Sequence, residues 1–434
     1  MRETVAPWAL GLLAAVLSLL RLVWQSPDAL TTLLWAEDGL FPLCVVKSDA
    51  LSCLVDPFAG YLLFAPRVIA AGVALFPMEQ WPLLTNLAAA AIAGVSAGIA
   101  FASMRAYGHT WAGSLLASLL IVLAPLVGLE AINAVGSVYM PLVFASAIAL
   151  AFPPRTRAGL VGLGILLAVT ILTIPSAIVL VAAVGIMAVR GRLGWLPAGI
   201  YAGILTVGVI LQWWIGSTAE TARNLTITGQ GLTDWITALP LAVVSFWPGL
   251  YFGEATIFGM FVIPPFTPTG LVLVVAVLAI ALWSAVRGSA AISVLLIAGL
   301  GLGAIPTLTG YASNRYFVLP AVLWAVAVVL AVDDRWGHAR RWLMPVILVA
   351  SVVVWSPAFP ASEWRAGASP VWGSEIERLR AECAGDPGRV VQVRFSPDWP
   401  MEMTVLDPIT TADALCAELQ GPLGIGVGAG FGPG

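Results

Sequence analysis

The sequence predicts an all-α polytopic membrane protein with about eleven transmembrane helices and a small α/β domain near the carboxy terminus. Sixty per cent of the 434 residues are apolar and only 10% are charged. The mean hydropathy is +0.97, whereas a soluble globular chain carries roughly 25% charged residues. The apolar stretches that recur along the chain lack the alternation of strands. Because a backbone in lipid must satisfy its hydrogen bonds internally, these stretches are predicted to be helices.

The apolar stretches define the predicted helices. The first one follows Arg2 and is interpreted as a retained helix, because no small-residue cleavage site of a signal peptide comes after it. The predicted helices are 8–24, 83–104, 112–129, 138–153, 159–172, 174–190, 195–216, 270–287, 290–306, 317–332 and 341–357. Residues 62–77 are interpreted as interfacial, and 234–268 as a loop or a re-entrant pair. A crossing by either segment would change the helix count.

Charged residues in the connections predict the orientation. One set of alternate connections holds Arg2, Arg105, Arg155, Arg157, Arg190, Arg192, Arg287, Arg335, Arg340 and Arg341. The other set holds Glu37, Asp38, Asp49, Asp56, Glu130, Glu220, Asp234 and Glu254. Basic residues favour the cytoplasmic side of short loops. We therefore predict a multi-pass inner (plasma) membrane protein with a cytoplasmic amino terminus and, because the helix count is odd, an extracytoplasmic carboxy terminus.

Composition divides the chain into three predicted parts. Residues 1–357 form the transmembrane domain, in which 25–82 is the first extracytoplasmic loop with interfacial helices. Residues 358–420 have the composition of a soluble protein and form a small extracytoplasmic domain, called the tail domain below. Residues 421–434 are half glycine and are predicted to be a flexible tail.

Within the tail domain, local patterns predict two helices and two strands. Ser374 is expected to cap a helix that ends near Cys383. Residues 389–395 and 401–406 are expected to form strands, and 410–419 a second helix.

The cysteines agree with this orientation. The four are Cys44, Cys53, Cys383 and Cys416, and all fall in segments predicted outside, where an oxidising environment permits disulfides. We expect Cys44–Cys53 to close a short loop and Cys383–Cys416 to staple the tail domain. The alternative is two pairs of unlinked thiols. A zinc site is disfavoured, because His109 and His338 are not on that side.

A pair of carboxylates, Glu37 and Asp38, follows the first predicted helix. Trp35 and Phe41 flank the pair, which would place it at the membrane surface, within reach of the head group of a lipid-linked substrate. Desolvation by these aromatic groups would suit a carboxylate to general-base work. Adjacent residues do not share a helical face, so only one of the two is expected to point into a given site. The alternative is a solvated turn, since Asp-Gly is a common turn dipeptide.

In these features the chain resembles the GT-C superfamily of membrane glycosyltransferases, in the version found in bacteria. The resemblance rests on the cytoplasmic amino terminus, the acidic pair Glu37-Asp38, the amphipathic stretch before the second spanning helix and the outer tail domain. It covers the whole architecture but only a few motif residues. It implies a GT-C-like fold and an inverting transfer of a sugar from a polyprenyl-phosphate donor, with Asp38 as base and Glu37 as its neighbour or a metal ligand.

The chain departs from the family pattern in two ways. The first outer loop lacks a strict Asp-x-Asp, and the chain lacks the Trp-Trp-Asp-Tyr-Gly signature of oligosaccharyltransferases. The second departure argues against protein N-glycosylation. The first leaves a requirement for a divalent cation open, and no other cofactor is implied.

A phosphorylated donor needs cations on the outer side, and the planar arginine fork makes paired hydrogen bonds to phosphate. The outer candidates are Arg21, Arg67, Arg223 and Arg315. Arg315 lies where an outer loop enters the predicted helix 317–332, and Arg67 follows the acidic loop, so these two are predicted to bind the donor phosphate. The alternative for both is an interfacial arginine that reaches lipid phosphates, and this is the interpretation favoured for Arg21.

Tyr61, Glu130, Asn133 and Trp235 are predicted to bind the sugar or the acceptor. Glu130 and Asn133 lie at the outer end of the predicted helix 112–129, where capping of the helix end is the alternative. Tyr61 and Trp235 can stack on a sugar, as can Tyr139, yet aromatic residues gather at membrane interfaces regardless.

The resemblance implies a polyprenyl-phosphate sugar as donor and a cell-envelope glycan or glycolipid as acceptor, with the lipid bilayer but no nucleic acid as further partner. A lipid-linked donor fits because nucleotide sugars are not supplied outside the membrane. One alternative is a transporter or flippase for lipid-linked envelope intermediates, against which stand the few charges at mid-membrane depth and the lack of a detectable repeat. Another is a non-catalytic assembly partner. The ratio of one lysine to nineteen arginines is typical of a GC-rich bacterial genome, such as an actinobacterium's.

Overall fold

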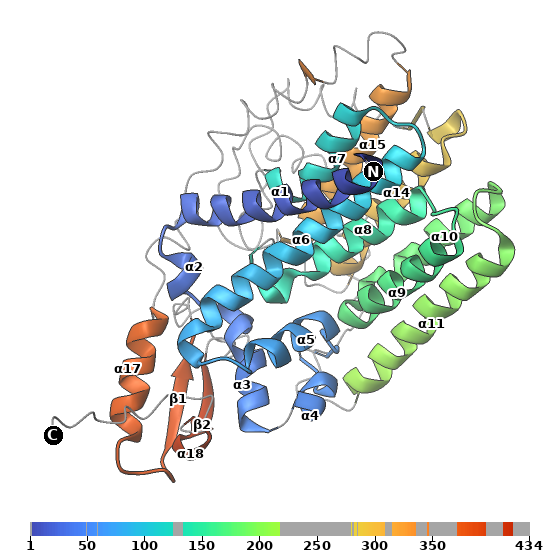
Figure 1. The fold of residues 1–434 in the computed structure, drawn as a ribbon. Helices are drawn as coiled ribbons and strands as arrows, with labels where there is room; N and C mark the ends of the chain where they lie inside the picture. The colour runs from blue at the N-terminus through green and yellow to red at the C-terminus, as the bar shows by residue number, and fades with distance from the viewer. Residues whose placement is uncertain are drawn as a thin grey trace.

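The computed structural model describes most of the transmembrane domain and part of the tail domain. The described residues are 2–48, 50–58, 60–124, 133–217, 279, 282–283, 285–308, 315–335, 345–346, 371–395 and 411–419. Helices make up most of this part, with one two-stranded sheet near the carboxy terminus (Figure 1). The predicted helices 270–287 and 341–357 lie largely outside the described residues, and so does the segment 234–268.

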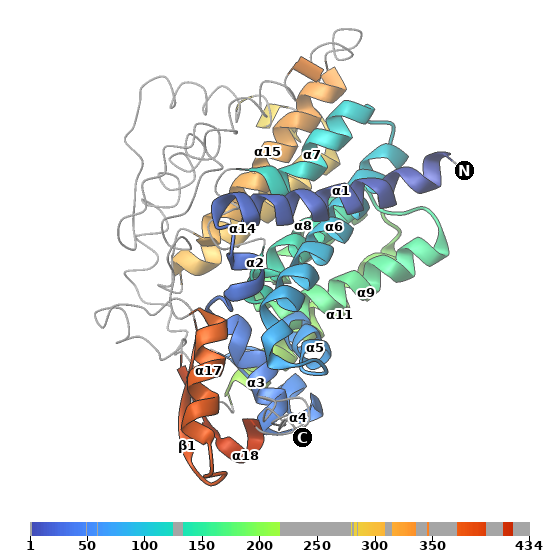
Figure 2. The ribbon, with the colours of Figure 1, turned by 60° about the vertical axis from the view of Figure 1, so that its left-hand side comes forward.

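Within the described part, three helices are long and apolar enough to cross a membrane. They contain the stretches Val5–Trp24 in α1 (Arg2–Gln25), Met78–Ala106 in η2 (Met78–Gln80) with α6 (Trp81–Ala106), and Trp195–Ser217, which is α11. The other helices of this region are α7 (Trp111–Leu123), α8 (Tyr139–Ala151), α9 (Arg157–Thr173), α10 (Leu180–Val189), α14 (Ala290–Leu308) and α15 (Arg315–Arg335). Each of these overlaps a helix predicted from the sequence. Figures 1 and 2 show α6, α8 and α9 running beside one another.

Small residues let α1 and α6 approach closely. A Cβ atom on Gly94 of α6 would lie 2.4 Å from the backbone oxygen of Gly11 in α1, and one on Gly98 would lie 2.9 Å from the oxygen of Pro7. Close backbone contact at small residues is a common way for helices to associate in lipid, where the hydrophobic effect no longer drives them together.

Hydrogen bonds between residues near the helix ends group these ends into two sets. At one end, the Tyr107 hydroxyl donates to the oxygen of Pro153 at 2.9 Å, and the Thr110 amide donates to Asp333 at 2.8 Å. At the other end, the Ala65 amide donates to the Thr173 hydroxyl at 3.1 Å. The arginine-rich connections and the acidic first outer loop therefore lie at opposite ends of the helices. Which end faces the cytoplasm stays a prediction.

Exposed tryptophans lie near both ends of α1 and α11. Trp8 and Trp24 of α1 are 75% and 73% exposed, and Trp195 and Trp213 of α11 are 74% and 73% exposed. At 1.5 Å per residue, the two pairs are separated by about 24 and about 27 Å of helix. These spacings approach the ~30 Å hydrocarbon core, and tryptophan gathers at its two interfaces.

The first outer loop folds into short helices. They are α2 (Ala29–Thr32), η1 (Ala36–Gly39), α3 (Leu40–Lys47), α4 (Ala50–Val55) and α5 (Phe64–Val73). At 10 residues, α5 is about 15 Å long, too short to span the bilayer and in keeping with an interfacial helix. The predicted disulfide Cys44–Cys53 is confirmed and joins α3 to α4.

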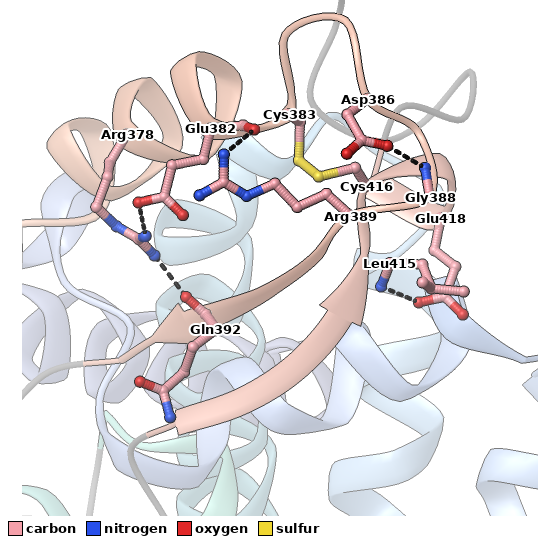
Figure 3. Close-up of a disulfide and its surroundings, with 10 residues drawn as sticks. All are labelled: Arg378, Glu382, Cys383, Asp386, Gly388, Arg389, Gln392, Leu415, Cys416 and Glu418. Carbon is pink, nitrogen blue, oxygen red and sulfur yellow. Dashed lines mark hydrogen bonds and ion pairs between the residues drawn. A yellow bond between two sulfur atoms is a disulfide. The ribbon is translucent and has the colours of Figure 1, made fainter.

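The described part of the tail domain is a helix packed on two antiparallel strands. Its elements are α17 (Trp372–Cys383), β1 (Val390–Arg394), β2 (Thr411–Leu415) and α18 (Cys416–Leu419). The strands are antiparallel, with Val390 opposite Leu415. The predicted disulfide Cys383–Cys416 is confirmed and ties the end of α17 to the start of α18 (Figure 3). Both views of the fold place this unit beside α3 (Figures 1 and 2).

Two local predictions for the tail domain are wrong. Ser374 is not the cap of the first helix: the helix begins at Trp372, and the Ser374 hydroxyl donates to the oxygen of Val371 at 2.8 Å. The helix begins earlier than predicted, and the buried ring of its first residue, Trp372, packs against the first outer loop. Residues 411–415 form a strand instead of the predicted helix, because they pair with β1 and bury Ala414. The predicted strand 401–406 lies outside the described residues.

Candidate functional site

Asp38 is buried at a junction between distant segments. Its side chain is 3% exposed and lies in η1. One carboxylate oxygen accepts the backbone N–H of Val135 at 2.9 Å, and the other accepts that of Gly136 at 2.8 Å. These amides begin η4 (Val135–Ser137), the turn that leads into α8. The solvated-turn alternative for Asp38 is therefore wrong, and hydrogen bonds to the carboxylate stabilise its charged form.

Trp35 supports the same junction. Its side chain is buried against Ala134, next to the amides that hold Asp38. The backbone oxygen of Trp35 accepts the Asp38 N–H at 3.0 Å and closes the turn that carries the carboxylate. The aromatic residue predicted to flank the acidic pair thus packs on the partner segment of Asp38.

Asn133 links this junction to α1. It is buried, accepts a hydrogen bond from the Ser18 hydroxyl at 2.8 Å, and donates to the backbone oxygen of Ser18 at 3.4 Å. These partners belong to α1, so the expected alternative of capping helix 112–129 does not describe its contacts. The buried Asn133, bonded to Ser18, joins the carboxy-terminal part of α1 to the turn before α8.

Arg21 contradicts the interpretation as a snorkelling arginine. Its guanidinium is buried, and Nη1 donates to the backbone oxygens of Val122 and Ala124 at 2.8 Å each. The last carbonyls of a helix have no partner within the helix, and Arg21 supplies donors to the end of α7. The sequence showed only an arginine near the end of an apolar segment, a pattern shared by both roles.

Arg67 lies close to the segment that carries Asp38. It is 4% exposed, and its Nη2 donates to the backbone oxygen and to the carboxylate of Asp56 at 2.9 and 3.1 Å. The guanidinium also sits 5.1 Å from the centre of the Phe41 ring, a cation–π contact. Burial lowers the pKa of Arg67 from its ordinary value, and Asp56 opposes this effect. Among the described residues, its buried Nε has no hydrogen-bond partner.

Tyr61 lies in a turn that docks on α11. The half-buried Tyr61 exchanges backbone hydrogen bonds with Phe58 at 2.8 and 3.1 Å. The next amide, that of Leu62, donates to the buried Gln212 of α11 at 2.6 Å. This loop is thus fixed to the carboxy-terminal part of α11. Gln212 was not singled out from the sequence, and a lone glutamine near a helix end carries no signal of this role.

Four predicted site residues are described incompletely or not at all. Glu130 and Trp235 lie outside the described residues, as does the outer candidate Arg223. For Glu37 and Arg315, only the backbone is described: Glu37 lies in η1, and Arg315 is the first residue of α15.

The tail domain packs directly on the first outer loop and the start of α6. Trp372 stacks on Trp81 with ring centres 6.0 Å apart, and its indole N–H donates to the oxygen of Met78 at 2.6 Å. Polar contacts join the same surfaces. They are the ion pair Arg380–Glu79 and the hydrogen bond from Lys47 to the backbone oxygen of Asp413. The tail domain and the acidic loop therefore share one core.

Comparison with solved structures finds several similar chains, among them an archaeal membrane enzyme. No family model and no curated protein matches the chain. The structure is similar to the archaeal oligosaccharyltransferase AglB from Archaeoglobus fulgidus, solved in complex with an inhibitory peptide and a dolichol-phosphate. The identity is 12% and the TM-score 0.49, over 88% of this chain and 58% of AglB.

Proposed function

We propose that this protein is a membrane glycosyltransferase of the GT-C kind. It transfers a sugar from a polyprenyl-phosphate donor to a glycan or glycolipid of the cell envelope at the outer face of the membrane. The observation that carries the proposal is the buried Asp38, held between the first outer loop and the turn before α8. The resemblance of the loop and tail architecture to the GT-C superfamily supports the same assignment.

Asp38 is the proposed general base. A base must begin the reaction as a carboxylate, and two backbone amides favour that form. Asp38 takes the proton of the acceptor hydroxyl while the acceptor oxygen attacks the anomeric carbon. The bond from that carbon to the phosphate oxygen breaks, and its electron pair leaves with the polyprenyl phosphate. Attack on the face opposite the leaving group inverts the anomeric centre.

Arg67 is the proposed partner of the donor phosphate, together with Arg315. The proposal is supported by the buried guanidinium of Arg67, whose Nη2 is held by Asp56. Its contact with Phe41, three residues after Asp38, keeps the cation near the proposed base. A fixed cation stabilises charge that develops on the departing phosphate.

The test is sugar transfer in vitro by the purified protein. Radiolabelled polyprenyl-phosphate sugars and a cell-envelope extract supply the donor and the acceptor. Asp38→Asn is compared with Asp28→Asn, an exposed carboxylate of the same loop. We expect the Asp38 variant to lose about 100-fold or more in rate, the usual range for a general base, and the Asp28 variant to match the wild type.

Two outcomes would contradict the proposal. Robust transfer by Asp38→Asn would remove Asp38 as the base. Wild-type protein that moves lipid-linked intermediates across liposome membranes, yet transfers no sugar from any donor, would instead establish the flippase alternative. Thermal unfolding of each variant separates a loss of chemistry from a loss of fold.

A further inference from the structure

Gly39, the residue after Asp38, lies where the structure leaves no room for a side chain. Its backbone angles are φ −82° and ψ −27°, a helical conformation that any residue adopts. A Cβ atom on Gly39 would lie 2.1 Å from Cδ1 and 2.2 Å from Cε1 of Phe395, far inside van der Waals contact. The ring of Phe395 therefore rests directly on the backbone next to Asp38.

Phe395 belongs to the tail domain and is firmly held there. Phe395 is the residue directly after β1, and it is 1% exposed. The ring stacks on Trp372 with centres 5.9 Å apart and planes 17° apart. Trp372 stacks in turn on Trp81, the first residue of α6, at 6.0 Å and 18°. A continuous stack of three aromatic rings thus connects the start of α6 to Gly39.

The opposite constraint on this turn comes from the transmembrane domain. The Asp38 carboxylate is fixed by the amides of Val135 and Gly136. Asp38 and Gly39 share a peptide bond, so a shift of Gly39 moves Asp38 relative to these donors. The turn is held between the segment before α8 and the ring of Phe395.

We infer that Phe395 is a positioning residue for Asp38, so that the seating of the tail domain sets the geometry of the active site. The inference rests on the proposed function. Phe395 acts only through Gly39: its ring excludes any larger residue there and keeps the carboxylate aimed at the acceptor hydroxyl. In this role the tail domain forms a wall of the site, joined to the loop by a shared core.

Size exchange at the contact tests the inference without reference to catalysis. The variants are Gly39→Ala, Phe395→Ala and the double variant. Gly72→Ala is the control, because a Cβ on Gly72 of α5 meets no atom within 4 Å. Hydrogen exchange followed by mass spectrometry should accelerate in both η1 and β1 in Gly39→Ala. The double variant should return η1 toward the wild type, and Gly72→Ala should change neither segment. If η1 and β1 exchanged hydrogen at the wild-type rate in Gly39→Ala, Phe395 would not constrain Gly39 and the inference would be wrong.

Steady-state transfer then tests the positioning role. We expect Gly39→Ala to lower kcat at least tenfold with little change in the donor KM, and the double variant to recover part of that loss. Equal kcat in Gly39→Ala and wild type would overturn the role of Phe395, even if exchange is altered. Absence of transfer by the wild type would overturn the proposed function, whereas the exchange experiment would still decide whether Phe395 constrains Gly39.

Discussion

Asp38 accepts a hydrogen bond at 2.9 Å from the backbone N–H of Val135, which lies 97 residues further along the chain. With the matching bond from Gly136, this contact joins the first outer loop to the start of α8. The proposed base is thus also a structural link, and the two roles make separable predictions.

Asp38→Ala is expected to destabilise the fold as well as abolish transfer. The substitution leaves the amides of Val135 and Gly136 without their carboxylate acceptor, and a buried donor that loses its partner costs about 1–3 kcal/mol. Thermal unfolding in detergent should show a lower midpoint for Asp38→Ala than for Asp28→Ala. An unchanged midpoint would mean that the two amides find other acceptors.

Arg67→Lys is expected to weaken donor binding. Lysine keeps the charge but lacks the planar fork that serves Asp56 and a phosphate together. Loss of one hydrogen bond to a charged group costs about 1.5–3 kcal/mol, so the donor KM should rise about tenfold or more. Arg157→Lys, at an exposed arginine of the opposite helix ends, is the control. A donor KM unaffected by Arg67→Lys would assign Arg67 to the loop structure alone.

Glu375 makes the tail domain sensitive to acid. Burial raises the pKa of Glu375, but hydrogen bonds from Arg378 and Arg394 outweigh it, and the net pKa lies below the ordinary 4.5. A lowered folded-state pKa adds stability above the unfolded value that is lost as the pH falls through the folded value.

Melting of the wild type should therefore shift to lower temperature as the pH falls from about 5 toward 3. Glu375→Gln should melt lower than the wild type at pH 7 and lose part of this dependence. Glu377→Gln, at the exposed neighbour, should keep the wild-type profile. An identical pH profile for Glu375→Gln would show that the ion pairs with Arg378 and Arg394 add no stability.

The two disulfides are expected to differ in importance. The bond Cys383–Cys416 spans 33 residues and Cys44–Cys53 spans 9. In the chain-entropy account the longer loop contributes about 3.7 kcal/mol and the shorter about 2.6 kcal/mol. The variant with serine at both Cys383 and Cys416 should therefore unfold at a lower temperature than the variant with serine at both Cys44 and Cys53. The reverse order would indicate that the short bond stabilises α3 and α4 by more than loop closure.

The orientation predicts which positions a membrane-impermeant thiol reagent reaches in intact cells or spheroplasts. A cysteine introduced at Asp28 should be labelled from outside, and one at Arg157 only after permeabilisation. These exposed residues lie at opposite ends of the helices. Labelling in the opposite pattern would show that the predicted orientation is wrong and that Asp38 lies on the cytoplasmic side.

The sequence alone was enough to locate α1, α6 and α11, because a stretch of about twenty predominantly apolar residues is a local property and such a stretch crosses lipid as a helix. It also paired all four cysteines correctly, since the two members of each pair lie in the same short loop or in the same small domain. It pointed to the acidic pair Glu37-Asp38 between Trp35 and Phe41, and the resemblance to the GT-C superfamily selected Asp38, but neither revealed the amides that hold it.

The tertiary structure decided everything that depends on distant partners. Residues 411–415 became a strand because β1 was there to pair with, and Trp372 extended its helix because Trp81 and Met78 received its ring. Arg21 donates to the end of α7, and Gly39 has no room for a Cβ atom because Phe395 lies against it. Hydropathy and turn patterns are set by near neighbours in the chain, whereas buried hydrogen bonds and ring stacking join segments that only folding brings together.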